Sequence, residues 1–91
     1  MIDSFRDKTL KRFAETGDAS KLPVPNGKRL RRLLLALQAA EKPADMDLPG
    51  FGFHELRGAR KGTYAVRVTG NWRLTFRWND GAIDVALEDY H

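Results

Sequence analysis

The chain has 91 residues, enough for one hydrophobic core, and we expect residues 1–91 to form a single domain. It contains no cysteine, which excludes disulfides and thiolate chemistry and suits the reducing cytoplasm. No segment is apolar for long enough to cross a bilayer, so no membrane partner is expected. The net charge is +4, and between residues 52 and 78 six basic side chains accompany one acidic side chain. Such clustering favours nucleic acid or an acidic partner, the alternative being a merely solubilising surface.

The N-terminal third predicts two helices separated by a proline-containing connector. Residues 2–14 predict a short extended start and then a helix that Asp7 caps and Gly17 ends. The apolar face of this helix consists of Leu10, Phe13 and Ala14. Residues 18–26 contain two prolines and predict a loop.

The second predicted helix covers residues 27–40 and is amphipathic. Four leucines fall on one stripe at helical spacing: Leu30, Leu33, Leu34 and Leu37. The remaining faces carry a basic group, which is either a set of phosphate contacts or a solvated surface: Lys28, Arg29, Arg31 and Arg32. Leu35 does not fit the stripe, so it either widens the apolar face or contacts a partner.

The C-terminal half predicts an antiparallel sheet. A short strand at residues 53–56 is followed by three strands of alternating polarity at residues 64–69, 72–78 and 83–88. Glycine with asparagine or aspartate in the intervening turns suits tight hairpins. One sheet face is apolar, with Ile83 among its members, and the other carries Arg67, Arg73 and Arg77. The expected fold is α+β, with both helices on the apolar face of a small antiparallel sheet and the arginine face left open.

Candidate chemistry lies at the two ends of this sheet. His54 and His91 have the pKa range for proton transfer, one from a ribose 2′-hydroxyl and one to a leaving 5′-oxygen. Arg67 and Arg73, on adjacent strands, can converge on one phosphate, and Tyr90 can stack on a base. On spacing alone the signal is weak, because a terminal histidine is usually a disordered chain end and a lone histidine beside Phe53 is usually a packing residue. The sequence has no glycine-rich phosphate loop and no metal-ligand spacing, so neither a cofactor nor a metal is expected.

Four short motifs, in order and ending with the chain, resemble one family. They are Phe53-His54-Glu55-Leu56-Arg57-Gly58, Tyr64-Ala65-Val66-Arg67-Val68, Asn71-Trp72-Arg73-Leu74-Thr75-Phe76 and Glu88-Asp89-Tyr90-His91. With the two helices before them, they resemble the HigB group of the RelE/ParE superfamily, the toxins of bacterial type II toxin–antitoxin modules.

The resemblance implies a RelE-like, microbial-RNase-like fold and a ribosome-dependent mRNA interferase. Such an endoribonuclease cleaves translated mRNA in the A site of the 70S ribosome, without metal, by attack of the 2′-hydroxyl. The implied catalytic residues are His54, Arg73, Asp89, Tyr90 and His91, and the phosphate-binding residues are Arg57, with Arg67 and Arg77 added from the sheet pattern. It also implies a helix-turn-helix antitoxin of the HigA kind, with operator DNA bound only by the complex.

One departure and two alternatives accompany this interpretation. Position 57 is arginine where many relatives have lysine, so it can bind phosphate but cannot exchange protons. A ParE-like gyrase poison would share the fold without needing His54 and His91 together. A non-catalytic RNA-binding or regulatory module would need the arginines and neither histidine.

Overall fold

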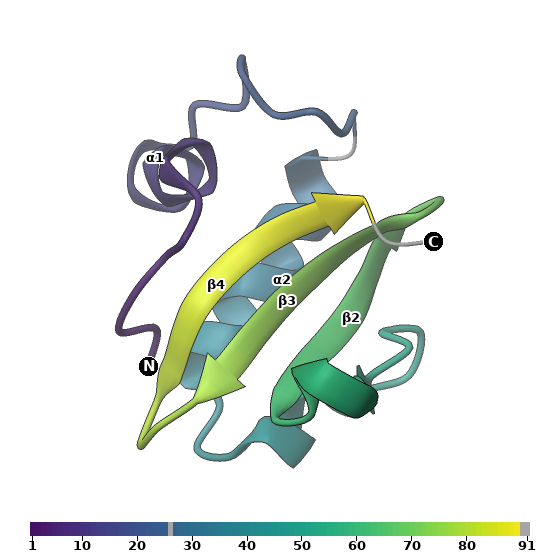
Figure 1. Cartoon of the computed structure of the whole chain (residues 1–91). Coiled ribbons are helices and arrows are strands. Elements are labelled where there is room, and N and C mark those ends of the chain that lie inside the picture. Colours follow the sequence, from purple (N-terminus) through teal and green to yellow (C-terminus); the bar gives the residue numbers. More distant parts are fainter. Residues whose placement is uncertain (26, 90–91) are drawn as a thin grey trace.

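The computed structural model describes residues 1–25 and 27–89, which form two helices and an antiparallel sheet. Helices α1 (Lys8–Thr16) and α2 (Gly27–Ala39) come first. A short 3-10 helix, η1 (Pro43–Met46), then leads toward the sheet. The strands lie in the order β1 (His54–Glu55), β2 (Thr63–Thr69), β3 (Trp72–Trp78) and β4 (Ala82–Asp89). A second 3-10 turn, η2 (Gly58–Arg60), follows β1. Figure 1 shows α2 crossing behind the twisted sheet, which confirms the expected α+β fold.

Helix α1 begins and ends where its capping residues predict. The Asp7 carboxylate accepts hydrogen bonds from the backbone N–H groups of Thr9 and Leu10, at 3.0 and 3.2 Å. Gly17 ends the helix with a φ of 78°, a left-handed conformation that costs glycine little. Leu10 and Phe13 are buried as expected, whereas Ala14 is exposed.

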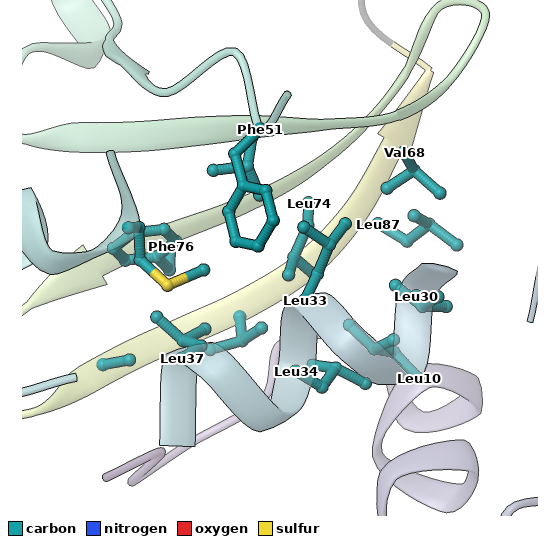
Figure 2. Close-up of a cluster of buried hydrophobic side chains, with 14 of the residues drawn as sticks. Leu10, Leu30, Leu33, Leu34, Leu37, Phe51, Val68, Leu74, Phe76 and Leu87 are labelled. Atoms are coloured by element: carbon teal, nitrogen blue, oxygen red, sulfur yellow. The ribbon is translucent and has the colours of Figure 1, made fainter. Parts of the chain in front are cut away.

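The leucine stripe of α2 forms the centre of the core. Leu30, Leu33 and Leu37 are completely buried and Leu34 nearly so, and Figure 2 shows Leu33 directed toward Phe51 and Leu74. Burying one leucine side chain contributes about 1.5–3 kcal/mol, so this stripe holds α2 against the sheet. Leu35 lies outside the stripe and is 59% exposed.

The N-terminal segment pairs with the outer edge of β4. Isolated parallel bridges join Ile2 to Ala82 and Phe5 to Val85. Four backbone hydrogen bonds of 2.7–3.1 Å connect residues 1–6 to Ala82 and Val85. The segment therefore covers a strand edge that would otherwise be open to pairing with another chain.

Strand β4 breaks the alternation that the sequence predicts. Asp84 has a φ of 52°, and the β3–β4 register shifts at this point. Ile83 is consequently paired with Arg77 and shares its face, where it is only half-buried. The expectation that Ile83 belongs to the apolar face is wrong, because one bulged residue moves every side chain before it to the other face.

The arginine face is not left fully open. Arg60 of η2 donates hydrogen bonds to Glu88 of β4, so the segment that follows β1 reaches across the sheet. Figure 1 accordingly shows η2 on the side of the sheet opposite α2. The small residues in the middle of this face are buried: Thr63, Ala65, Thr75 and Ala86. The arginine side chains of this face therefore surround a central patch of small, buried residues.

Candidate functional site

His54 and Arg67 both contact the backbone at Gly52. The Nδ1 atom of His54 lies 3.0 Å from the Gly52 carbonyl oxygen. Because a carbonyl can only accept, this contact is a hydrogen bond when Nδ1 carries a proton, which leaves the lone pair of the neutral ring on Nε2. On the other side, a Cβ atom at Gly52 would lie 3.5 Å from Nη2 of Arg67. An exposed imidazole and a guanidinium thus flank one glycine.

Arg67 and Arg73 are direct cross-strand partners on β2 and β3. Such partners have Cβ atoms about 5 Å apart, and two like charges at this distance repel each other unless an anion lies between them. Arg73 is half-buried, and its Nη1 donates to the carbonyl oxygens of Gly70 at 2.7 Å and Trp72 at 3.1 Å. The sheet register thus places two cations side by side, an arrangement that suits an anion.

The strand register places His54 on the same sheet face as this arginine pair, two residues further along the sheet. His54 is opposite Ala65, which lies two residues before Arg67 on the same face of β2. Two residues along a strand correspond to about 7 Å. The structure therefore brings His54, Arg67 and Arg73 to one end of one sheet face.

Arg57 lies on the segment that crosses this face. It is exposed, immediately precedes η2, and lines a shallow hollow of about 320 Å³ together with Glu55 and Lys61. Its side chain is available to an anion beside the sheet.

Arg77 is separate from the other arginines. It is opposite Ile83, four residues along β3 from Arg73, which corresponds to about 14 Å. Its Nη1 lies 3.9 Å from Oδ2 of Asp84, in an exposed pair that contributes little to stability. The structure therefore does not bring Arg77 to the Arg67–Arg73 pair.

The C-terminal candidates are described only in part. Asp89 is exposed at the end of β4 and opposite Trp72, so the register assigns it to the face opposite that of Arg73. Tyr90 and His91 lie outside the described residues, and their roles stay predictions.

Glu88 is a member of this face that the sequence did not single out. Its carboxylate accepts two hydrogen bonds from Arg60, at 2.9 and 2.8 Å, pairs with Arg6 at 2.9 Å, and accepts from the Thr75 hydroxyl. Hydrogen bonding from Arg60, helped by Thr75, lowers the pKa of Glu88 to about 2 although burial acts in the opposite direction. The sequence offered one indication of this role: strand alternation puts the acidic Glu88 on the same sheet face as the arginines.

The basic group of α2 lies on the other side of the sheet. Its member Arg29 donates to the carbonyl oxygens of Gly50, at 2.7 Å, and Arg67, at 2.9 Å, and its guanidinium lies 5.9 Å from the centre of the Phe51 ring. Arg29 therefore anchors the loop before β1 to β2.

The chain is similar over its full length to known toxins. The family described as the RelE-like toxin HigB of type II toxin–antitoxin systems matches residues 3–91. The chain belongs to this HigB-like toxin family. Endoribonuclease HigB of Proteus vulgaris is 35% identical over 92 aligned positions that cover all of both chains. Toxin HigB-1 of Vibrio cholerae serotype O1 is 39% identical, over 99% of this chain and 94% of its own.

Membership of the HigB-like family confirms the resemblance drawn from the four motifs. The protein is a type II toxin, and an antitoxin partner belongs to that class. Within residues 1–25 and 27–89 there is no group of three or more His, Asp or Glu side chains that could hold a metal ion. Over the same part of the chain, no helix has the length and apolarity needed to cross a membrane.

Proposed function

We propose that this HigB-like toxin is a ribosome-dependent mRNA interferase, a cytoplasmic endoribonuclease that cuts translated mRNA in the ribosomal A site. The observation that carries the proposal is the position of His54, whose Nδ1 lies against the Gly52 carbonyl oxygen, two residues along the sheet from the Arg67–Arg73 pair. A base and an anion site at this spacing suit attack of a 2′-hydroxyl on the adjacent phosphate. The printed name of the Proteus vulgaris relative, an endoribonuclease, supports the same activity.

In the proposed reaction a base removes the 2′-hydroxyl proton and the 2′-oxygen attacks phosphorus. The 5′-oxygen leaves with a proton from an acid, and the products are a 2′,3′-cyclic phosphate and a 5′-hydroxyl end. Arg73 and Arg57 hold the phosphate and stabilise the charge that develops on its oxygens, with Arg67 beside them. Arg77 binds a neighbouring phosphate of the substrate, because it lies too far along β3 to share this one.

Two histidines share the proton transfers in this scheme. Arginine stays protonated throughout the physiological range, so Arg57 cannot donate a proton to the leaving oxygen. His91 is the better candidate for acid or base and His54 completes the task. Asp89 acts by orienting His91, because the register assigns it to the face opposite that of Arg73 and so away from the 2′-hydroxyl. Tyr90 orients the substrate or stacks on a base.

The test is to map cleavage ends on a translated reporter mRNA after induction of the toxin. We expect cuts within codons, with 2′,3′-cyclic phosphate ends, that His91→Ala and Arg73→Ala abolish. Unchanged growth arrest by both variants would overturn the site, and DNA-damage signalling without mRNA cuts would indicate a gyrase poison. Activity that tolerates loss of both histidines would indicate a non-catalytic RNA-binding module.

We further propose a HigA-type helix-turn-helix antitoxin as the partner, with operator DNA contacted through the complex. A groove of about 330 Å³ between α1 and α2 is lined mainly by apolar side chains, among them Phe5, Phe13 and the exposed Leu35. Arg31 also lines it, and Lys28 and Arg32 lie nearby on the same helix. This chemistry fits an amphipathic antitoxin segment with acidic flanks, bound on the far side of the sheet from the RNA site.

A further inference from the structure

Glu88 lies directly opposite Arg73, yet its carboxylate is bound by other cations. The two oxygens accept both Nη groups of Arg60, and Oε2 also pairs with Arg6. Arg73 instead donates to backbone carbonyl oxygens of the β2–β3 turn and of its own strand. The carboxylate therefore does not neutralise the arginine beside it, and Arg73 keeps its charge for an anion.

The Arg60–Glu88 contact spans most of the sheet. Arg60 belongs to η2, which follows β1 at one edge, whereas Glu88 is in β4, three strands away. Three strand spacings amount to about 14 Å, so the η2 segment must arch over the face to make this contact. Two parallel hydrogen bonds between the guanidinium and the carboxylate fix orientation as well as distance.

The bonded pair is shielded from solvent on the sheet side. The Glu88 side chain is 21% exposed, and Thr75, which donates to it, is 1% exposed. A charge pair in such a position is held more rigidly than a surface pair, and the loss of one partner costs more there than at the surface. Three segments meet at the Glu88 carboxylate: the N-terminal segment through Arg6, η2 through Arg60, and β3 through Thr75.

We infer that Glu88 is a positioning residue of the ribonuclease site, which joins η2 to β4 and so holds Arg57 over the face that carries His54 and Arg73. The inference rests on the proposed function. Arg57 directly precedes η2, so its place over the sheet depends on what anchors that turn. Phosphoryl chemistry requires charges held to within a fraction of an ångström, and a bidentate anchor three residues away supplies this. Glu88 also pairs with Arg6 and Arg60, so that these two arginines do not compete with Arg57 and Arg73 for the phosphates of the RNA.

The test uses the full-length toxin with Glu88→Gln and separates chemistry from binding. We expect the single-turnover cleavage rate on translated mRNA to fall at least 10-fold. Binding to single-stranded RNA is expected to be as tight or tighter at low salt, since Arg6 and Arg60 lose their shared carboxylate. The slope of log K against log salt is then steeper by about 0.7 for each added phosphate contact. A merely structural role would weaken both quantities together and would not steepen that slope.

Arg60→Met is the second variant, because it breaks the same pair while removing a cation. It is expected to lower the cleavage rate as Glu88→Gln does, without steepening the salt slope, and the double variant is expected to be no slower than either single one. The matched control is Asp84→Asn, which removes a carboxylate of the same strand and face from an exposed pair and is expected to cleave at the wild-type rate.

Three results would overturn the inference, and a fourth would instead overturn the proposed function. A folded Glu88→Gln toxin with the wild-type rate would overturn it, and so would rate losses that add in the double variant. A fall in rate that only tracks the folded fraction, measured by thermal melting, would also overturn it. If the wild-type toxin does not cut translated mRNA at all, the proposed function fails instead, whatever Glu88 does.

Discussion

The imidazole of His54 is anchored to the backbone of Gly52, with Nδ1 3.0 Å from the carbonyl oxygen. Gly52 has a φ of 62°, a conformation that residues other than glycine rarely adopt, and the Arg67 guanidinium lies where a Cβ atom at this position would contact it. One glycine thus sets both the tautomer of the candidate base and the position of a candidate phosphate ligand.

Gly52→Ala is expected to impair cleavage more than it impairs folding. The added methyl group comes only into ordinary van der Waals contact with Arg67, but the positive φ is strained, at a cost of about 1 kcal/mol in the free energy of unfolding. Relief of that strain shifts the Gly52 carbonyl that His54 contacts. Gly50→Ala is the control, because Gly50 has a φ of 83° but no atoms within 4 Å of the added methyl group. Urea unfolding is expected to show similar losses for both, and only Gly52→Ala is expected to lower the cleavage rate, by about 10-fold. Equal activity of the two variants would contradict this role of Gly52.

Arg73→Ala and Arg77→Ala are expected to fail in different ways. Arg73 belongs to the arginine pair and Arg77 lies about 14 Å along the same strand. Removal of Arg73 is expected to cost about 3 kcal/mol of transition-state stabilisation, or 100-fold or more in the cleavage rate. Removal of Arg77 is expected to leave that rate nearly unchanged and to make the salt slope of RNA binding shallower by about 0.7. Comparable rate losses would place Arg77 in the reaction after all.

Stability at acid pH is expected to depend on Glu88. Its pKa is held at about 2 by Arg60 against an ordinary value of 4.5, so the folded state binds this proton less readily than the unfolded state. The resulting contribution, on the order of 3 kcal/mol, is complete above pH 4.5 and is lost as the pH falls toward 2. Urea unfolding at pH 6 and pH 3 measures it, and Glu88→Gln is expected to flatten the difference.

Asp18→Asn is the control for that experiment. Arg12 also holds the pKa of Asp18 well below its usual range, but the Asp18–Arg12 pair is on the surface, where solvent screens it. The variant is therefore expected to keep the wild-type pH dependence. If the free energy of unfolding lost its pH dependence in Asp18→Asn but not in Glu88→Gln, the acid sensitivity would belong to Asp18 and not to Glu88.

Leu35→Glu is expected to weaken antitoxin binding without changing RNA cleavage. Leu35 is 59% exposed at the α1–α2 groove, and a carboxylate there would repel an acidic partner and interrupt an apolar contact. Leu48→Glu is the control, since Leu48 is 43% exposed outside the groove. Calorimetry with the cognate antitoxin is expected to show at least 10-fold weaker binding for Leu35→Glu alone. Wild-type affinity of that variant would remove the groove from consideration.

The local features of this protein follow from its sequence. The leucine stripe of α2, the Asp7 and Gly17 caps and the positions of the hairpin turns each depend on residues within one or two helical turns or one tight turn. Their physics is short-range, so periodicity and backbone preference are enough to predict them. The same holds for the placement of Arg67 and Arg73 on one face, because the apolar alternation of each strand fixes which of its side chains face the core. The turn alone would not pair them, since the register shifts between Arg67 and Thr69.

The tertiary structure alone decided how these elements combine into a site. The bulge at Asp84 moved Ile83 to the other face of β4, the strand that pairs with β3 on one edge and with the N-terminal segment on the other. The anchoring of Arg60 on Glu88 joins residues 28 positions apart and closes the middle of a face that alternation left open. Such a contact depends on which cation the fold places within hydrogen-bonding distance of the carboxylate. The two segments are about 14 Å apart across the sheet, and no local sequence pattern encodes that separation. The sequence determined which charges share the face, and the fold determined which of them remain available to RNA.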